Sequence, residues 1–210
     1  TSRVLYLILF SRWLGSELFG VYLLAFAIAE LVSKIALLGL DKGAMFISGV
    51  LKGQNREDEI REQVERLVLL VLLTSGLGAG ALAFFSDEIA VGLLGKPMLA
   101  GQLRAFCFWI PGTCATYTMI LAIRATMDLR YEVYVQSVVE PLLVLVFGAA
   151  ALLLDLGVRG AAYASGIASV VTFAFAFYCF RRVFPARDAT KPPSKIAWKS
   201  VWSNGFPMGM

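Results

Sequence analysis

The sequence predicts an all-α integral membrane protein with six transmembrane helices and the start of a seventh. Of its 210 residues, 59% are hydrophobic and 16% are charged, and the mean hydropathy is +0.74. This balance is not typical of a soluble domain of this size. Apolar runs of bilayer-spanning length recur along the chain, and loops rich in Lys and Arg alternate with loops poor in them.

The longest apolar run covers the 23 residues Leu18–Leu40 and contains Glu30 and Lys34. As a helix it is about 34 Å long, against a hydrocarbon core of about 30 Å. Glu30 then lies near the midplane, where an ionisable residue costs about 2.5 to 3.5 kcal/mol and usually faces a bundle interior or a wet cavity. The four-residue spacing, acid first, favours a helical ion pair. Two interpretations stay open: mutual neutralisation between packed helices, or the lining of a polar pathway.

The other apolar runs predict the rest of the lobe. The first expected helix ends near Leu14, and a seventh begins near Trp198. The five helices between them are expected at Leu18–Leu40 or beyond, Leu67–Phe85, Ala105–Ile123, Val133–Leu154 and Ala161–Phe180. Residues 1–197 are therefore assigned to one six-helix lobe with a truncated first helix, and residues 198–210 to the start of a further helix. Because the chain opens on Thr1 inside an apolar run, we expect it to be part of a longer protein.

Basic residues divide the predicted loops into two sets. The second, fourth and sixth loops hold twelve: Lys52, Arg56, Arg61, Arg66, Arg124, Arg130, Arg181, Arg182, Arg187, Lys191, Lys195 and Lys199. The first, third and fifth hold four: Arg12, Lys96, Arg104 and Arg159. The positive-inside rule places the first set, and the N-terminus, in the cytoplasm.

The second loop itself has a helical pattern. Asn55 is a predicted cap for a helix that extends the third span into the cytoplasm. Glu57 with Arg61, and Glu62 with Arg66, have the spacing of helical ion pairs.

Two prolines interrupt the predicted spans. Pro111 precedes Gly112 in the fourth helix, and Pro141 directly follows Glu140 in the fifth. A proline cannot donate to the carbonyl four residues before it, so Pro141 removes the helical partner of the Ser137 carbonyl. Glu140 is then a carboxylate at membrane depth beside a helix defect. It is either a site for a proton, cation or substrate group, or a carboxylate bonded to a neighbouring helix.

The composition argues against several kinds of site. The chain has no His, and Cys107, Cys114 and Cys179 lie in apolar segments without metal-ligand spacing. We therefore expect no metal and no cofactor. The basic residues follow the loops of a membrane protein, so nucleic-acid binding is not indicated.

Four stretches resemble a known family. They are Ser11–Tyr22 (SRWLGSELFGVY), Leu38–Ala44 (LGLDKGA) followed by Phe46-Ile47-Ser48, Val139–Leu143 (VEPLL), and Gly157–Ala164 (GVRGAAYA). In this order the motifs resemble polysaccharide flippases of the multidrug/oligosaccharidyl-lipid/polysaccharide exporter superfamily. That resemblance implies half of a two-lobed, MATE-like transporter in a bacterial or archaeal inner membrane. Many members have a basic residue where this chain has Met45, so no substrate role is carried to that position.

The resemblance implies a flippase rather than an enzyme. It would move an undecaprenyl-diphosphate-linked oligosaccharide to the outer leaflet by alternating access, with membrane lipids and the second lobe of the same chain as its other partners. Arg3, Lys34 and Arg124 are the candidate cations for the diphosphate, and Glu30 and Glu140 complete the predicted transport residues. The alternatives are a cation-coupled multidrug antiporter that uses Glu30 or Glu140, and a membrane-embedded glycosyl- or acyltransferase. The short loops and the lack of His argue against the enzyme.

Overall fold

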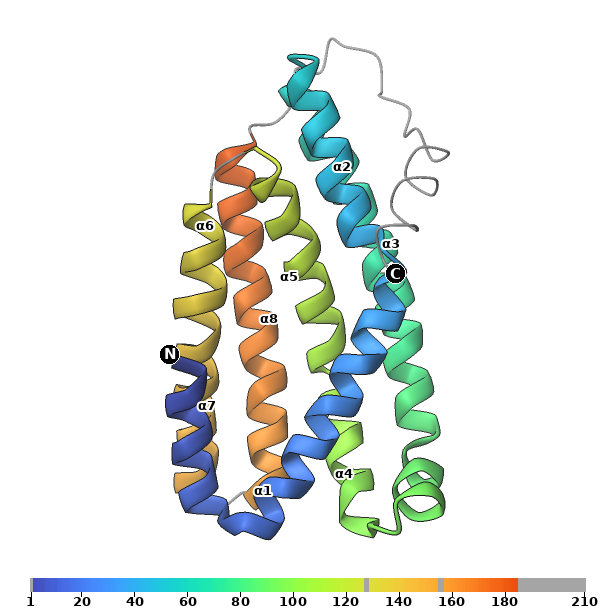
Figure 1. Ribbon diagram of the computed structural model, residues 1–210, viewed down its shortest axis with the longest axis vertical. Helices are drawn as coiled ribbons and strands as arrows, with labels where there is room; N and C mark the ends of the chain where they lie inside the picture. Colours follow the sequence, from blue (N-terminus) through green and yellow to red (C-terminus); the bar gives the residue numbers. More distant parts are fainter. Residues whose placement is uncertain (1, 127–128, 155–156, 185–210) are drawn as a thin grey trace.

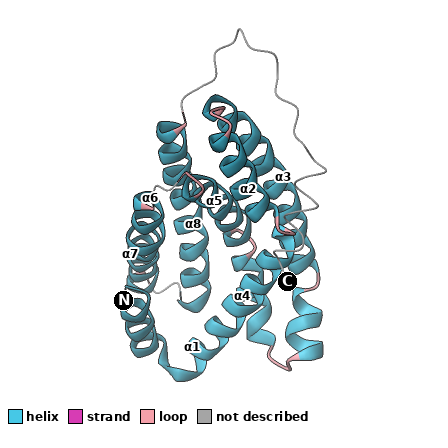
Figure 2. Cartoon of the chain, turned by 45° about the horizontal axis from the view of Figure 1, so that its top comes forward, coloured by secondary structure: helices cyan, strands magenta, loops and turns pink. Residues whose placement is uncertain are grey.

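The computed structural model describes residues 2–126, 129–154 and 157–184, and every regular element in these ranges is helical. Figures 1 and 2 show the helices running up and down the long axis of one bundle. The elements are α1 (Ser2–Leu37), α2 (Leu40–Gly53), α3 (Glu57–Phe84), the π-helix η1 (Glu88–Leu93), α4 (Pro97–Phe106), α5 (Trp109–Arg124), α6 (Arg130–Glu132), the π-helix η2 (Val133–Val139), α7 (Glu140–Leu153) and α8 (Gly157–Val183).

The N-terminal part of the chain has two helix breaks, and each contains a glycine with a positive φ. α1 turns sharply at Gly15, whose φ of 74° is in the left-handed region that glycine adopts without steric cost. A second left-handed step, at Leu38 (φ 48°) and Gly39 (φ 75°), separates α1 from α2. The predicted helix from Leu18 to beyond Leu40 is therefore wrong as one element: it is the second limb of α1 followed by α2.

The predicted helical extension of the third span is confirmed, because α3 is continuous from Glu57 to Phe84. Its cytoplasmic position stays a prediction. Two details of that prediction are wrong. Asn55 has a left-handed φ of 55° and is not the cap, a position that Arg56 takes without a side-chain hydrogen bond. Arg61 pairs with Glu65 at 3.1 Å rather than with Glu57, and Glu65 also lies 3.5 Å from Arg181 on α8. The predicted pair of Glu62 and Arg66 forms.

Four helices in the described residues are long and apolar enough to cross a membrane: Gly15–Leu37, Glu57–Phe84, Arg130–Ala151 and Gly160–Val183. A fifth span results if α4 and α5, which meet at 42°, are counted together. These counts establish a multi-helix membrane architecture but do not confirm the predicted number of six. The limb of α1 before Gly15 falls outside the set, and the predicted helix near Trp198 lies outside the described residues.

The bend between α4 and α5 follows from Pro111. Its ring nitrogen cannot donate to the carbonyl of Cys107, and the break falls between Phe106 and Trp109. The predicted fourth helix, Ala105–Ile123, is wrong at its beginning, because α4 already starts at Pro97 within the expected loop.

Helix α5 lies at the centre of the bundle, in contact with α1, α2, α3 and α8. The core beside it is aromatic: Phe26 of α1 packs 5.1 Å from Trp109 and 5.9 Å from Phe106, centroid to centroid. The buried Tyr22 hydroxyl lies 2.9 Å from Ser165 Oγ on α8. Ser165 Oγ in turn donates to Ala161 O, so Tyr22 is the donor between the two helices.

The ends of the bundle match the predicted loop alternation. Figure 1 shows the α2–α3 turn, the end of α5 and the end of α8 at one end, and the turn within α1, η1 and the beginning of α8 at the other. The loops rich in Lys and Arg therefore share an end wherever they are described. Which end faces the cytoplasm stays a prediction, and Lys191 lies outside the described residues.

Cysteine labelling tests this orientation. In a background without Cys107, Cys114 and Cys179, a cysteine at Gly53 or Lys191 should be protected from an impermeant thiol reagent in intact cells, because both loops belong to the basic set. A cysteine at Lys96 should react. Labelling of the first two from outside, with Lys96 protected, would reverse the topology.

Candidate functional site

A small pocket lies between α5, η2, α7 and α8. The space open to the centre of a water-sized sphere is about 10 Å³, which is room for roughly one water molecule. Its walls are polar side chains from spans that are otherwise apolar: Thr113, Thr116, Tyr117, Gln136, Glu140, Ser169 and Thr172. Four of these, the three threonines and the serine, are almost fully buried.

Hydroxyl groups of the pocket donate their hydrogens to their own helices. Thr116 Oγ1 donates to Gly112 O, Ser169 Oγ to Gly166 O and Thr172 Oγ1 to Ala168 O, each at 2.8 Å. A hydroxyl that donates in this way keeps its oxygen lone pairs as acceptors. The surface that the lining residues expose to the pocket is nevertheless almost entirely apolar.

The helix defect predicted from Pro141 is present next to Glu140. Residues Val133–Val139 form a π-helix, and the Glu140 N–H donates to Val135 O, five residues back. Single π turns inside helices are frequent at functional sites. Gln136, within the π-helix, and Glu140, directly after it, both line the pocket.

A close approach of α5 and α8 forms another part of the pocket. A Cβ added at Gly112 would lie 2.7 Å from Ser169 Oγ and 3.1 Å from the Ser169 carbonyl carbon. A Cβ at Gly166 on α8 would lie 3.2 Å from the Phe108 Cβ. Small residues therefore permit contact between these helices, as in other membrane bundles.

The predicted pair of Glu30 and Lys34 forms on α1, with Lys34 Nζ 2.9 Å from Glu30 Oε1. Both side chains are open to the surroundings: the exposed fraction is 69% for Lys34 and 45% for Glu30. The pair is thus on the surface of the bundle rather than between packed helices. Neither residue lines the Glu140 pocket.

The other two predicted cations are not brought to the pocket. Arg124, at the end of α5, lies 3.3 Å from Glu132 and is about half exposed. Arg3 belongs to the first limb of α1, but its side chain is outside the described residues. The five predicted residues therefore do not gather into one site within the described structure.

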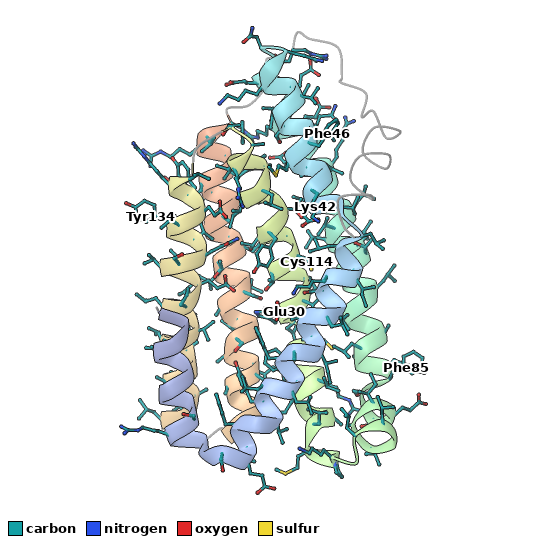
Figure 3. The ribbon with its side chains drawn as sticks, in the orientation of Figure 1. Glu30, Lys42, Phe46, Phe85, Cys114 and Tyr134 are labelled. Carbon is teal, nitrogen blue, oxygen red and sulfur yellow. The ribbon has the colours of Figure 1, made fainter. Side chains whose placement is uncertain are left out.

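An open groove runs between α2 and α5 near the upper end of the bundle in Figure 1. Its volume is about 610 Å³, and it is lined by Lys42, Met45, Phe46, Gly49, Val50, Leu121 and Ala125. In Figure 3, Glu30, Lys42 and Phe46 follow one another from mid-height toward that end. The groove surface is almost entirely apolar, and Lys42 is its one ionisable residue among those described.

Sequence reasoning missed the residues that line the pocket together with Glu140, and it missed that Lys42 lines the α2–α5 groove. The sequence did contain a signal for the pocket residues. Thr116 and Tyr117 follow Thr113 by three and four residues, and Thr172 follows Ser169 by three. Polar residues at these intervals share one face of a helix. Only the packing of α5, α7 and α8 shows that these faces meet.

Residues 3–210 match the sequence profile of the family described as "Polysaccharide biosynthesis protein". The chain belongs to this family. No curated protein and no solved structure matches it. Membership in the polysaccharide biosynthesis family, together with the apolar spans, identifies a membrane protein with a transport-related role in polysaccharide synthesis.

Proposed function

We propose that the chain is the N-terminal lobe of a flippase that moves an undecaprenyl-diphosphate-linked saccharide from the cytoplasmic to the outer leaflet. The observation that carries this proposal is the family match over residues 3–210. The proposal keeps the predicted division into a lobe of residues 1–197 and the start of a further helix in residues 198–210, of which residues 185–210 lie outside the described structure. Rocking of the two lobes exposes the substrate alternately to each side, and no covalent step is needed, so the protein is not an enzyme.

The exposed pair on α1 supports a polar pathway. Glu30 and Lys34 lie within the candidate span Gly15–Leu37. Charged side chains at membrane depth avoid lipid and face a bundle interior or water. This surface of α1 is therefore where the second lobe and a water-filled cavity are expected.

The α2–α5 groove supports an amphipathic, anionic substrate. A lipid-linked saccharide diphosphate has an apolar chain and a strongly anionic head, and it needs both an apolar surface and cations. The groove offers the apolar surface, with Lys42 beside it. Lys42 thus joins Lys34 as a candidate contact for the diphosphate.

A strain that lacks the full-length protein provides the test. In this strain, the full-length protein should restore surface polysaccharide. In a second assay, vesicles that contain the full-length protein should transfer a labelled lipid-linked saccharide across their membranes. Residues 1–210 alone should do neither, because a cavity between two lobes has only one wall here. Each result is compared with the amount of protein in the membrane.

Full restoration by residues 1–210 alone would refute the two-lobe mechanism. Vesicles that contain the full-length protein but move no saccharide would refute the substrate assignment.

A cation-coupled antiporter is the second candidate, because the carboxylate residue Glu140 lies within a candidate membrane span and lines a pocket. The two candidates differ in cargo. Export of small cationic drugs by the full-length protein, without transfer of lipid-linked saccharide, would favour the antiporter.

A further inference from the structure

We propose that the basic end of α8 binds the headgroup of an anionic membrane phospholipid, whose acyl chain lies along the exposed face of the same helix. The headgroup site consists of Arg181 and Arg182, neither of which lines the Glu140 pocket or the α2–α5 groove. The proposal concerns the lipid around the protein rather than its cargo, so it does not depend on the proposed flippase function.

One face of α8 is apolar and uncovered along most of the helix. Its large exposed side chains are Tyr163, Ile167, Val170, Val171, Phe175 and Tyr178. They recur mainly at intervals of three and four residues, which places them on one side of the helix. Because α8 contains the candidate membrane span Gly160–Val183, this side is suited to contact with hydrocarbon.

The same face of α8 ends in two arginines. Arg181 and Arg182 follow Tyr178 by three and four residues, so they continue the apolar side of the helix. Arg182 is exposed, and so is half of the Arg181 side chain. Tyr178 lies between the apolar part and the arginines, and tyrosine is enriched where hydrocarbon meets headgroups. The order along α8 therefore matches the order of acyl chain, interface and phosphate in a phospholipid.

The charges beside these arginines are unequal. Glu65 Oε1 on α3 lies 3.1 Å from Arg61 Nε and 3.5 Å from Arg181 Nε, so two guanidinium groups share one carboxylate. Within the described residues, Arg182 forms no ion pair. Three arginines and one glutamate leave an excess of positive charge, which favours an anionic headgroup over one that also carries a positive group.

The position of Arg181 suits a phosphate ligand. Its guanidinium carbon lies 4.1 Å from the centroid of the Phe177 ring. A guanidinium group that stacks on a ring keeps the N–H groups at its edge for other acceptors. Arginine binds phosphate through two parallel N–H···O hydrogen bonds, so a stacked guanidinium is already oriented for this contact.

Fluorescence quenching by brominated lipids tests the site in the full-length protein in vesicles. In a cysteine-free background, Phe175→Cys carries a fluorophore, and a small fraction of phosphatidylglycerol or phosphatidylcholine is brominated in the half of the acyl chain nearer the headgroup. Phosphatidylglycerol should associate with this position at least about fivefold more strongly than phosphatidylcholine. Ile167→Cys, about 21 Å along the helix from Arg181, should show no preference.

Removal of the two charges should abolish the preference. In the Phe175→Cys protein, Arg181→Gln/Arg182→Gln should bring the ratio of the two association constants close to one. The matched control is Arg56→Gln/Arg66→Gln, which removes two arginines that pair with glutamates of α3 at the same end of the bundle. This control should keep the ratio.

Equal quenching at position 175 by the two lipids would overturn the proposal. Quenching by neither lipid would also overturn it, since another part of the protein would then cover this face. An equal loss of preference in the two double variants would assign the effect to general surface charge and not to α8. If Arg181→Gln/Arg182→Gln does not fold, Arg182→Gln alone must lower the ratio, and an unchanged ratio would refute the site.

Discussion

Gly112→Ala is expected to lower the free energy of unfolding by about 1 to 3 kcal/mol. The added methyl carbon would lie 2.7 Å from Ser169 Oγ and within 3.2 Å of two backbone atoms of Ser169. The Ser169 side chain could rotate, but its backbone cannot yield unless α8 shifts away from α5. Because Ser169 and Thr172 of α8 line the Glu140 pocket, that shift would also widen the pocket.

The matched control is Gly76→Ala on α3. A Cβ there meets nothing within 4 Å, and alanine is the better helix former by about 1 kcal/mol in soluble helices. Thermal unfolding in detergent and the level of folded protein in membranes should show a loss for Gly112→Ala and none for Gly76→Ala. Equal stability of the two variants would contradict the close approach of α5 and α8.

Lys34→Ala is expected to reduce polysaccharide export by about ten- to a hundredfold with little loss of folded protein. A hydrogen bond to a charged group contributes about 1.5 to 3 kcal/mol, which corresponds to this range. Breaking the ion pair itself should cost less than about 1 kcal/mol, because both side chains are largely exposed. Lys34→Arg should retain part of the export, since it keeps the positive charge.

Exchange of the two residues separates packing from transport. Glu30→Lys/Lys34→Glu keeps the pair but places a carboxylate where the diphosphate is expected, so the protein should insert while export remains defective. The control is the same exchange at Glu62 and Arg66, a helical pair on α3. Surface polysaccharide is measured against membrane protein level. Normal export by the exchanged Glu30 and Lys34 would assign the pair to packing.

Local patterns were sufficient to predict several features. Pro111 and Pro141 each remove one backbone donor, so the positions of the α4–α5 bend and of the π-helix before Glu140 follow from covalent chemistry. The spacing of Glu30 and Lys34 was sufficient to predict their ion pair. The apolar runs predicted where the four candidate spans of the described residues lie, because only apolar helices of that length are stable in a bilayer.

Local patterns failed where a residue had a choice of partners. Arg61 could pair with Glu57 or Glu65, and in the structure it pairs with Glu65, which also lies 3.5 Å from Arg181 on α8. The step at Leu38 and Gly39 divided a run that hydropathy alone treats as continuous. In both cases the deciding contact or dihedral angle is absent from the hydropathy pattern.

The sequence by itself determined that this chain is a helical membrane protein of the polysaccharide biosynthesis family, with Glu140 beside a helix defect. Only the tertiary structure decided which residues share a pocket with Glu140, because the polar residues of α5 and α8 reach that pocket only after α5, η2, α7 and α8 pack together. It also decided that Glu30 and Lys34 are exposed, since the side of a helix that stays open depends on where its neighbours lie. Helix periodicity specifies which residues share a face, and packing specifies what that face contacts.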